Sequence, residues 1–496
     1  MVVDMLQSWY AGQKLKADQM EGQPHFYQML EATLDGRRRK KAMVSLRERP
    51  AGTVDFASND FLGLSMDGIL RERFLQELEN NKGFTLGSGG SRLLDGSNPY
   101  INQLEKRIAA FHKAESALIF NSGYEANIAI FGSLPSPTDV IIYDEFIHAS
   151  VHVGMKVTRA ATKMSFLHNN LDDFRRVLTR VRESDPVFKL GLRTVLIAVE
   201  TVYSMDGDIA PLRELSDIAT EIFPRGNAIF VVDEAQATGV IGEKGAGYIS
   251  ATGLESKMAI RLHTYGKGLS SNGAAVLCPD TVRDYLINYA PGIIYTTSPS
   301  FPFLAAIKCA YDLLEDGSTA PLQAKIEALV RRFYSKLHAL PSWPASKAAG
   351  ILSVPTGEDF ESQTYLSQIV PLIAPDTMSL VALMHFMDYV AWPHQYPVVP
   401  RGKQRVRLRF HAHNTEAQVD GLIEILDQWM KVQLMAVECN EPVDVEGLVT
   451  AASAGPKELQ KALADILRKV EMHHTKMAMV EVNEVLVPQE PQVVMS

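Results

Sequence analysis

The sequence predicts an α/β protein in which a mostly parallel sheet is covered by helices. Between about residues 100 and 280, short apolar runs typical of strands alternate with stretches of helical periodicity. Strands that are separated by helices can pair in parallel, because each helix carries the chain back along the sheet. The predicted strands are Ala117–Phe120, Val140–Tyr143, Thr194–Val199, Ala228–Val232 and Ala274–Cys278.

The pattern changes on both sides of this region. We expect an N-terminal helical segment over residues 1–55, which the run Arg49–Gly52 interrupts, and a large domain over 56–330. A smaller α+β domain is predicted over 331–432, with strands at Gln368–Leu372 and Arg405–Phe410. The tail, 433–496, contains a helical stretch near 457–472 and carries no functional prediction.

Bulk composition indicates an ordinary globular protein. The chain has 496 residues, 46% of them hydrophobic and 22% charged, and a net charge of −9, which gives no reason to expect nucleic-acid binding. The basic run Arg37–Lys41 is interpreted as a solvated helix face, with docking of an acyl carrier as the alternative. No apolar run of about 18 residues predicts a membrane span.

Cysteine content and the N-terminus bear on location. Three cysteines, Cys278, Cys309 and Cys439, form neither a disulfide framework nor a metal cluster, and no metal site is expected. The N-terminal residues include charged side chains and lack the apolar core of a secretory signal. We therefore expect a cytoplasmic protein.

The segment His263–Leu269 places Lys267 between two glycines after an apolar run. A buried lysine with a lowered pKa can form a Schiff base, although an isolated lysine of this kind is more often a solvated loop residue. Asp233 ends the predicted strand upstream. A carboxylate paired with a pyridinium nitrogen, together with a Schiff-base lysine, is the minimum equipment for pyridoxal 5'-phosphate (PLP) chemistry.

Motifs in a fixed order connect these two residues with the rest of the chain. From about residue 25 to about 430, the sequence resembles the α-oxoamine synthase family of fold-type I PLP enzymes, related to class I/II aminotransferases, and is closest to its 8-amino-7-oxononanoate synthase branch. The motifs that carry the resemblance are Asn59–Leu64, Gly87–Arg92, Ser122–Asn127, His148–Ser150, Glu200–Asp208, Asp233, Lys267, Gly273–Cys278 and Arg407.

The resemblance implies a role for each candidate site residue. The cofactor phosphate is expected at the helix N-terminus formed by Ser122, Gly123 and Tyr124, with Thr264 as a further donor. Thr296 and Thr297 match a segment that reaches the neighbouring subunit's phosphate, which implies a homodimer.

The ring and substrate contacts follow in the same way. His148 is expected to stack on the cofactor ring, Asp233 to hold its pyridinium nitrogen, and Lys267 to carry the Schiff base. Glu200 and Ser204 match positions near the cofactor and the acyl substrate.

Arg407 lies on a predicted strand in which Arg405, Arg407 and Arg409 share one face. A guanidinium binds a carboxylate with two hydrogen bonds, but a solvated basic face is the alternative, and the spacing does not choose among the three arginines. The resemblance selects Arg407 as the residue that binds the substrate carboxylate.

Two positions depart from the family pattern. Gln236 stands where the family has a histidine that bonds the cofactor's phenolic oxygen, and Asn414 replaces another histidine. Glutamine donates a hydrogen bond but carries no proton at neutral pH. We expect the pH profile to change, while cofactor binding persists.

The predicted reaction is the decarboxylative condensation of an amino acid with an acyl thioester, on CoA or a carrier, to give an α-amino ketone. An aminotransferase acting on a ketone or aldehyde is the alternative enzyme, and a catalytically inactive partner subunit is the non-enzyme alternative. Lys267 and Asp233 together argue against the inactive subunit. The amino acid and the acyl group are not predicted.

Overall fold

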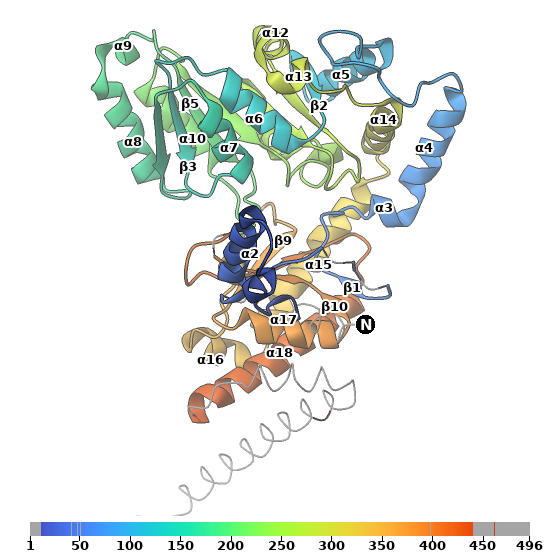
Figure 1. Ribbon diagram of the computed structural model, residues 1–496, viewed down its shortest axis with the longest axis vertical. Coiled ribbons are helices and arrows are strands. Elements are labelled where there is room, and N and C mark those ends of the chain that lie inside the picture. Colours follow the sequence, from blue (N-terminus) through green and yellow to red (C-terminus); the bar gives the residue numbers. More distant parts are fainter. Residues whose placement is uncertain are drawn as a thin grey trace, which may run out of the picture.

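The computed structural model describes residues 11–40, 42–46, 48–49, 51–396, 398–439 and 461. Figure 1 shows two lobes: a large sheet with flanking helices, and a smaller lobe built around β9 and helices α15 to α18. The N-terminal helix α2 (His25–Arg38) lies beside the smaller lobe. The predicted α/β fold class is confirmed.

The large sheet has seven strands in the order β2-β8-β7-β6-β5-β3-β4. All neighbouring pairs are parallel except those of β8, which runs antiparallel to both β2 and β7. The strands are β2 (Ser116–Phe120), β3 (Val140–Asp144), β4 (Thr162–Phe166), β5 (Val195–Glu200), β6 (Ala228–Asp233), β7 (Ile260–Thr264) and β8 (Ala274–Cys278).

The five strands predicted in this region are present, with ends that shift by at most one residue. The prediction missed β4 and β7 for different physical reasons. Strand β4 lies at the sheet edge, and most of its side chains are exposed, so it needs few apolar residues. Strand β7 is buried but contains Arg261 and His263 among its apolar residues.

Helices cover both faces of this sheet. One apolar cluster packs α8 and α10 against β3, β5 and β6, and another packs α6, α7 and α12 on the opposite side. The helices of the large lobe are α3 (Leu64–Asp67), α4 (Ile69–Asn80), α5 (Pro99–Phe111), α6 (Gly123–Ser133), α7 (Ala149–Val157), α8 (Leu171–Ser184), α9 (Pro186–Lys189), α10 (Leu212–Ile222), α11 (Tyr248–Thr252), α12 (Asp280–Tyr289), α13 (Pro291–Ile294) and α14 (Phe301–Glu315).

The smaller lobe contains an antiparallel sheet in the order β11-β12-β9. Its strands are β9 (Ile369–Ile373), β11 (Trp392–His394) and β12 (Arg405–Arg409), and both strands predicted here are confirmed to within one residue. Its helices are α15 (Ala320–His338), α16 (Ser342–Ala348), α17 (Thr377–Phe386) and α18 (Glu416–Cys439).

The N-terminal segment differs from the helical prediction. It contains a short 3-10 helix at Ala17–Met20 and helix α2, but residues 42–46 are not helical. The chain then forms β1 (Val54–Asp55), which pairs in parallel with β10 (Tyr389–Val390) of the smaller lobe. Pairing across more than 300 residues leaves no local sequence signal, which explains the miss.

The C-terminal tail was predicted to hold a helical stretch near 457–472, which lies outside the described residues except for position 461. Helix α18 continues to Cys439, seven residues past the boundary expected at 432. The division at 55, 330 and 432 stays a prediction. Within the described part of the chain, no helix combines the length and apolar character that a membrane crossing requires.

Candidate active site

Three functional side chains stand at the carboxyl ends of adjacent parallel strands. Glu200 ends β5 and lies opposite Asp233, which ends β6; Asp233 in turn lies opposite Leu262 of β7. Lys267 follows the end of β7 by three residues. Ligands of open α/β sheets bind at this edge, because the turns after parallel strands leave a crevice there.

These groups change one another's proton affinity. Burial lowers the pKa of Lys267, and the carboxylates of Asp233 and Glu200 oppose this effect. Burial raises the pKa of Glu200 well above its ordinary value, and Asp233 raises it further. A lysine that loses its proton more easily is a better nucleophile and base.

The Asp233 carboxylate is held by two donors. Asn127 Nδ2 donates to Oδ2 at 2.9 Å, and the backbone N–H of Ala235 donates to Oδ1 at 2.9 Å. Asn127 also donates to Ser150 Oγ at 3.0 Å. Sequence reasoning assigned Asn127 no role, although it closes the motif Ser122–Asn127. The two bonds fix the carboxylate and leave lone pairs for a third donor.

His148 directly precedes α7, and the charges of Asp233 and Lys267 act on its imidazole. Its Nδ1 atom is 2.7 Å from Ser150 Oγ, and its ring meets the Tyr124 ring edge-on, with 6.4 Å between centroids. Part of the ring is exposed, yet the surrounding protein displaces enough water to lower its pKa, while Asp233 opposes the effect. The imidazole therefore lies within electrostatic reach of Asp233 and is partly open to solvent.

The turn from β2 into α6 has the geometry of an anion site. Ser122 caps the helix, since its Oγ accepts a hydrogen bond from the Glu125 N–H at 3.1 Å. A Cβ atom at Gly123 would lie 2.1 Å from Thr264 Oγ1, so only glycine permits this approach. The structure thus brings Thr264 against the N-terminus of α6, where backbone N–H groups favour a phosphate.

The smaller lobe contributes the arginines of β12. Arg407 is buried, and its Nη1 donates to the Ser204 carbonyl oxygen at 2.5 Å. Burial of Arg405, Arg407 and Arg409 rules out the solvated basic face that the sequence left open. The guanidinium of Arg407 therefore reaches the loop that follows β5.

Gln236 follows Asp233 by three residues and contacts the smaller lobe. Its backbone oxygen accepts a 2.7 Å hydrogen bond from Gln368 Nε2, and its side-chain Oε1 is buried without a partner among the described residues. The amide nitrogen and oxygen of glutamine exchange by rotation, so the group can donate or accept. Its free polar end suits a ligand oxygen near Asp233.

Thr296 and Thr297 do not join the buried group. Both are exposed, and the Thr297 carbonyl accepts a 3.3 Å hydrogen bond from Asn121, the neighbour of Ser122. Thr297 also forms a bridge with Ser91. The two threonines thus lie at the outer rim of the phosphate turn.

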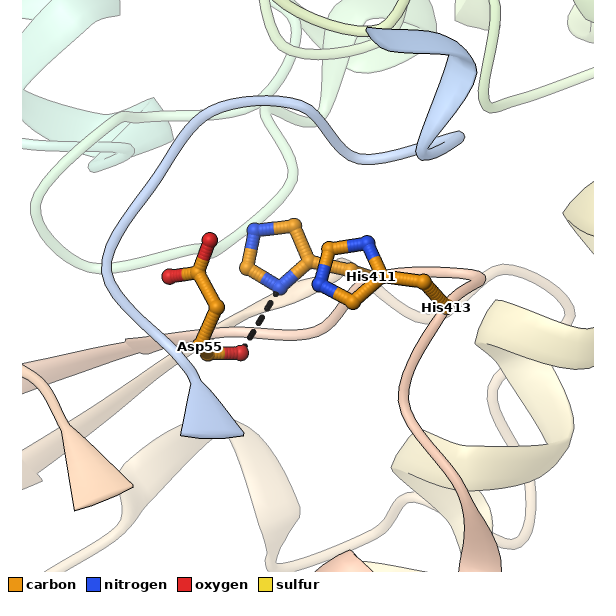
Figure 2. Close-up of side chains that lie close together, drawn as sticks. All are labelled: Asp55, His411 and His413. Atoms are coloured by element: carbon orange, nitrogen blue, oxygen red, sulfur yellow. Dashed lines mark hydrogen bonds between the residues drawn. The ribbon is translucent and has the colours of Figure 1, made fainter. Parts of the chain in front are cut away.

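Figure 2 shows Asp55, His411 and His413 close together, with ligand atoms within 4.8 Å of one another. Asp55 and His411 are already engaged in hydrogen bonds, whereas His413 Nδ1 is buried without a partner among the described residues. The Asp55 carboxylate accepts hydrogen bonds from the backbone N–H groups of Ala57 and Ser58 and pairs with Arg49. His411 directs Nδ1 to the Asp55 carbonyl at 3.1 Å and Nε2 to the Ser58 carbonyl at 3.0 Å. The bonds of Asp55 and His411 fasten the chain after β1 to the end of β12.

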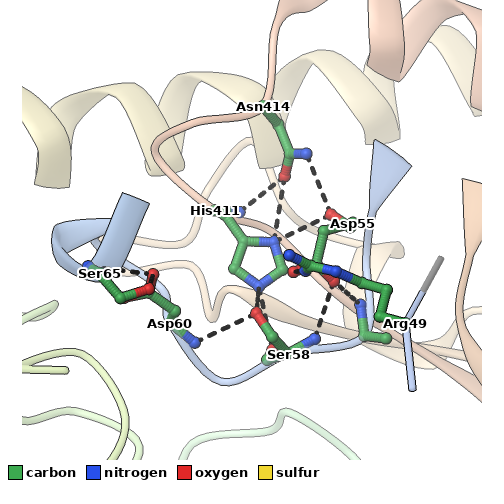
Figure 3. A network of polar contacts seen from close by, with 8 residues as sticks. Arg49, Asp55, Ser58, Asp60, Ser65, His411 and Asn414 are labelled. Carbon is green, nitrogen blue, oxygen red and sulfur yellow. Dashed lines mark hydrogen bonds and ion pairs between the residues drawn. The ribbon is translucent and has the colours of Figure 1, made fainter. Parts of the chain in front are cut away.

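Asn414 belongs to this network (Figure 3). Its Oδ1 accepts from the His411 N–H at 2.9 Å, and its Nδ2 donates to the Asp55 carbonyl at 3.1 Å. The asparagine found in place of the family histidine therefore connects two backbone segments. Asp60, in the same network, bonds Ser270, three residues after Lys267.

Comparison with known proteins places this geometry in a family. The family model described as aminotransferase class I and II matches residues 51–426. The chain belongs to this family. It is 42% identical over 450 residues to the aminoacyl transferase sphA of Aspergillus fumigatus, covering 90% of this chain and 94% of the relative. It is 46% identical over 384 residues to the 8-amino-7-oxononanoate synthase of Emericella nidulans, covering 77% of this chain and 90% of that protein.

Solved structures agree on the fold. A serine palmitoyltransferase from Sphingomonas wittichii superposes with a TM-score of 0.66 at 21% identity, covering 84% of this chain and 99% of the other. The 8-amino-7-oxononanoate synthase of Francisella tularensis gives 0.59 at 24% identity, covering 77% and 99%. The predicted α-oxoamine synthase resemblance within the PLP-dependent aminotransferase class I and II family is thereby confirmed.

Proposed function

We propose that this family member condenses an amino acid with an acyl thioester, with loss of CO2, to give an α-amino ketone. The observation that carries the proposal is the convergence of Lys267, Asp233 and Glu200 at the ends of three adjacent parallel strands. The sphA and 8-amino-7-oxononanoate synthase relatives, at 42% and 46% identity, support an acyl-transferring member of the family.

The residues present fit pyridoxal 5'-phosphate. Gly123 lets the Thr264 hydroxyl approach the N-terminus of α6, where a phosphate would find donors, and the buried Gln236 side chain, three residues after Asp233, has a polar atom without a partner among the described residues. Ser122, Gly123, Tyr124 and Thr264 would hold the phosphate, Asp233 the pyridinium nitrogen, and Lys267 the aldehyde carbon. When bound, this cofactor supplies an electron sink for the negative charge that develops at the amino acid's α-carbon.

Each protein group has a task in the reaction. Lys267 takes the α-proton, because burial favours its neutral amine. Asp233, held by Asn127, balances the positive charge on the ring nitrogen. His148, whose pKa responds to Asp233, would stack on the cofactor ring and exclude water from it.

The substrate is positioned from both lobes. Arg407 binds the α-carboxylate, and its bond to the Ser204 carbonyl orients the guanidinium. Burial raises the pKa of Glu200 well above its ordinary value, which favours the protonated carboxyl, and in that form it can donate a hydrogen bond to the acyl carbonyl oxygen. These roles complete the set proposed for the site.

We also propose a homodimer in the cytoplasm. Tyr295, which directly precedes Thr296, is 83% exposed, and Leu86 is 77% exposed. Apolar side chains this exposed at the edge of a site are typical of a surface that a partner covers. The described thiols of Cys278 and Cys309 are free and buried, which is compatible with a reducing compartment.

The test is to incubate the PLP-loaded protein with a panel of amino acids and acyl thioesters and to measure CO2 and free thiol. Both products are expected together, in equal amounts. Formation of a keto acid without release of thiol would show that the enzyme transfers an amino group and does not catalyse the condensation.

A further inference from the structure

The three arginines of β12 are buried on one face but differ in their partners. Their exposed fractions are 2% for Arg405 and 7% each for Arg407 and Arg409. Arg405 is neutralised by Asp206 and also bonds the carbonyl oxygens of Met205 and Lys403. Its charge is therefore used within the protein.

Arg409 has no comparable partner. Among the described residues, no carboxylate forms an ion pair with its guanidinium, no side-chain hydrogen bond is made, and its buried Nε is unsatisfied. Asp55 is the one acid whose charge acts on it, and that carboxylate is already bonded by Arg49 and two backbone N–H groups (Figure 3). Burying a guanidinium without an anion is costly, so such a site favours an anionic ligand.

Arg407 is only partly satisfied as well. Its single bond is to the Ser204 carbonyl, which is neutral, and its Nε is also buried without a partner. Two guanidinium groups on this face thus lack anions. Residues two apart on a strand are separated by about 6.6 Å, so the two groups can receive two neighbouring carboxylates.

Arg409 shares a strand face with Arg407, whose guanidinium reaches the loop after β5. The positive charge of Arg409 opposes protonation of Lys267. The next residue, Phe410, donates its N–H to the Gln368 carbonyl at 2.8 Å, and Gln368 bonds the backbone of Gln236, three residues after Asp233. The end of β12 is thus tied to the segment after Asp233, and an amino acid held by Arg407 would lie about 6.6 Å along the strand from Arg409.

We propose that Arg407 and Arg409 bind the two carboxylates of an amino dicarboxylic acid, Arg407 the α-carboxylate and Arg409 the second one. This inference rests on the proposed function and names the class of its amino substrate. A short dicarboxylate places both anions near the α-carbon, within reach of both arginines. The distant carboxylate of a long acyl chain is the other source of the same chemistry.

The first experiment measures binding without turnover. Malonate and acetate are titrated calorimetrically into the PLP-loaded protein in the absence of any thioester. We expect malonate to bind at least about tenfold more tightly than acetate, because a charged hydrogen-bonded pair is added. Arg409→Met should remove the difference, and Arg409→Lys should keep part of it. Arg401→Met, at an exposed arginine just before β12, is the matched control and should bind as the unmodified protein does.

Equal malonate affinity in the unmodified protein and in Arg409→Met, with both folded by circular dichroism, would overturn the proposal. If the proposed condensation is wrong, peptide mapping will show no cofactor on Lys267. The comparison of malonate affinity between the Arg409 variants can still be interpreted in that case.

The second experiment identifies the source of the second carboxylate. Values of kcat/KM are measured for aminomalonate and L-aspartate against glycine and L-serine. Arg409→Met is expected to lower kcat/KM for the dicarboxylates at least about tenfold more than it lowers the value for glycine. If Arg409→Met instead raises only the KM of pimeloyl-CoA relative to octanoyl-CoA, the carboxylate belongs to the acyl group and the assignment to the amino acid is wrong.

Discussion

The side-chain amide of Asn127 donates a 2.9 Å hydrogen bond to the carboxylate of Asp233. Asn127 lies on α6, the helix whose N-terminus forms the phosphate turn, and Asp233 ends β6. One bond therefore joins the element proposed to hold the cofactor's phosphate to the residue proposed to hold its ring nitrogen. The packing of α6 on the sheet therefore sets the distance between the phosphate turn and Asp233.

Replacing Asp233 with asparagine should leave some PLP bound but lower kcat by at least about tenfold, equal to about 1.4 kcal/mol of barrier. The amide cannot balance a protonated ring nitrogen. Steady-state kinetics at saturating amino acid measures the effect, with Asn127→Ala as the milder comparison. A kcat close to that of the unmodified enzyme would reduce Asp233 to a structural role.

Lys267→Ala should abolish covalent attachment of the cofactor and lower turnover by at least about 100-fold, since the base for the α-proton is removed. The fold should be retained, because Lys267 lies on a turn after β7. Borohydride reduction followed by peptide mapping checks the attachment. Cofactor found on a different lysine would refute the assignment.

Gln236→His should be tolerated and should make the cofactor's absorbance depend on pH near neutrality, since imidazole titrates there and an amide does not. The buried Gln236 side chain has the free polar atom needed for contact with the ring oxygen. Spectroscopic titration of both proteins tests this. Identical titration curves would show that position 236 does not touch the ring.

The homodimer proposal predicts complementation between defective chains. Lys267→Ala chains and Thr296→Val/Thr297→Val chains should each be inactive, yet mixed dimers should recover activity in one of two sites. One site then collects both intact elements. Subunit exchange is verified with differently tagged chains. Absence of recovery after proven exchange would place both threonines in the same chain's site as Lys267, or outside it.

His168 should stabilise the fold in a pH-dependent way. Burial alone would lower its pKa, but Asp144 at 2.8 Å and Asp208 at 2.7 Å raise it to about 10. Because the folded pKa is higher than the unfolded one, the stabilisation is complete below about pH 6.5 and is lost as pH rises through 10.

His168→Gln should therefore lower the free energy of unfolding by roughly 3–5 kcal/mol at pH 6, and the difference should shrink toward pH 10. Urea unfolding at several pH values checks this. A difference that stays constant with pH would mean that the charge on His168 does not contribute.

The strands of the large sheet could be predicted because burial on both faces makes them continuous apolar runs, as in Ala274–Cys278. Asp233 could be predicted because it ends such a run, and Lys267 because two glycines flank it. Arg409 was indistinguishable from Arg405 in the sequence, since both alternate with apolar residues; the difference lies in Asp206, about 200 positions away. The link from Asn127 to Asp233 likewise depends on how α6 packs, which no local pattern encodes.

The groups proposed for chemistry and those proposed for substrate choice belong to separate sheets: Lys267 and Asp233 follow strands of the large sheet, whereas Arg407 and Arg409 lie on β12. A change on β12 can thus redirect the enzyme to another amino acid while the cofactor stays in place. For protein engineering, one five-residue strand becomes the natural unit to exchange between members of the family. Diversification of products in this family can proceed along the same route, with the reacting lysine and its carboxylate inherited unchanged.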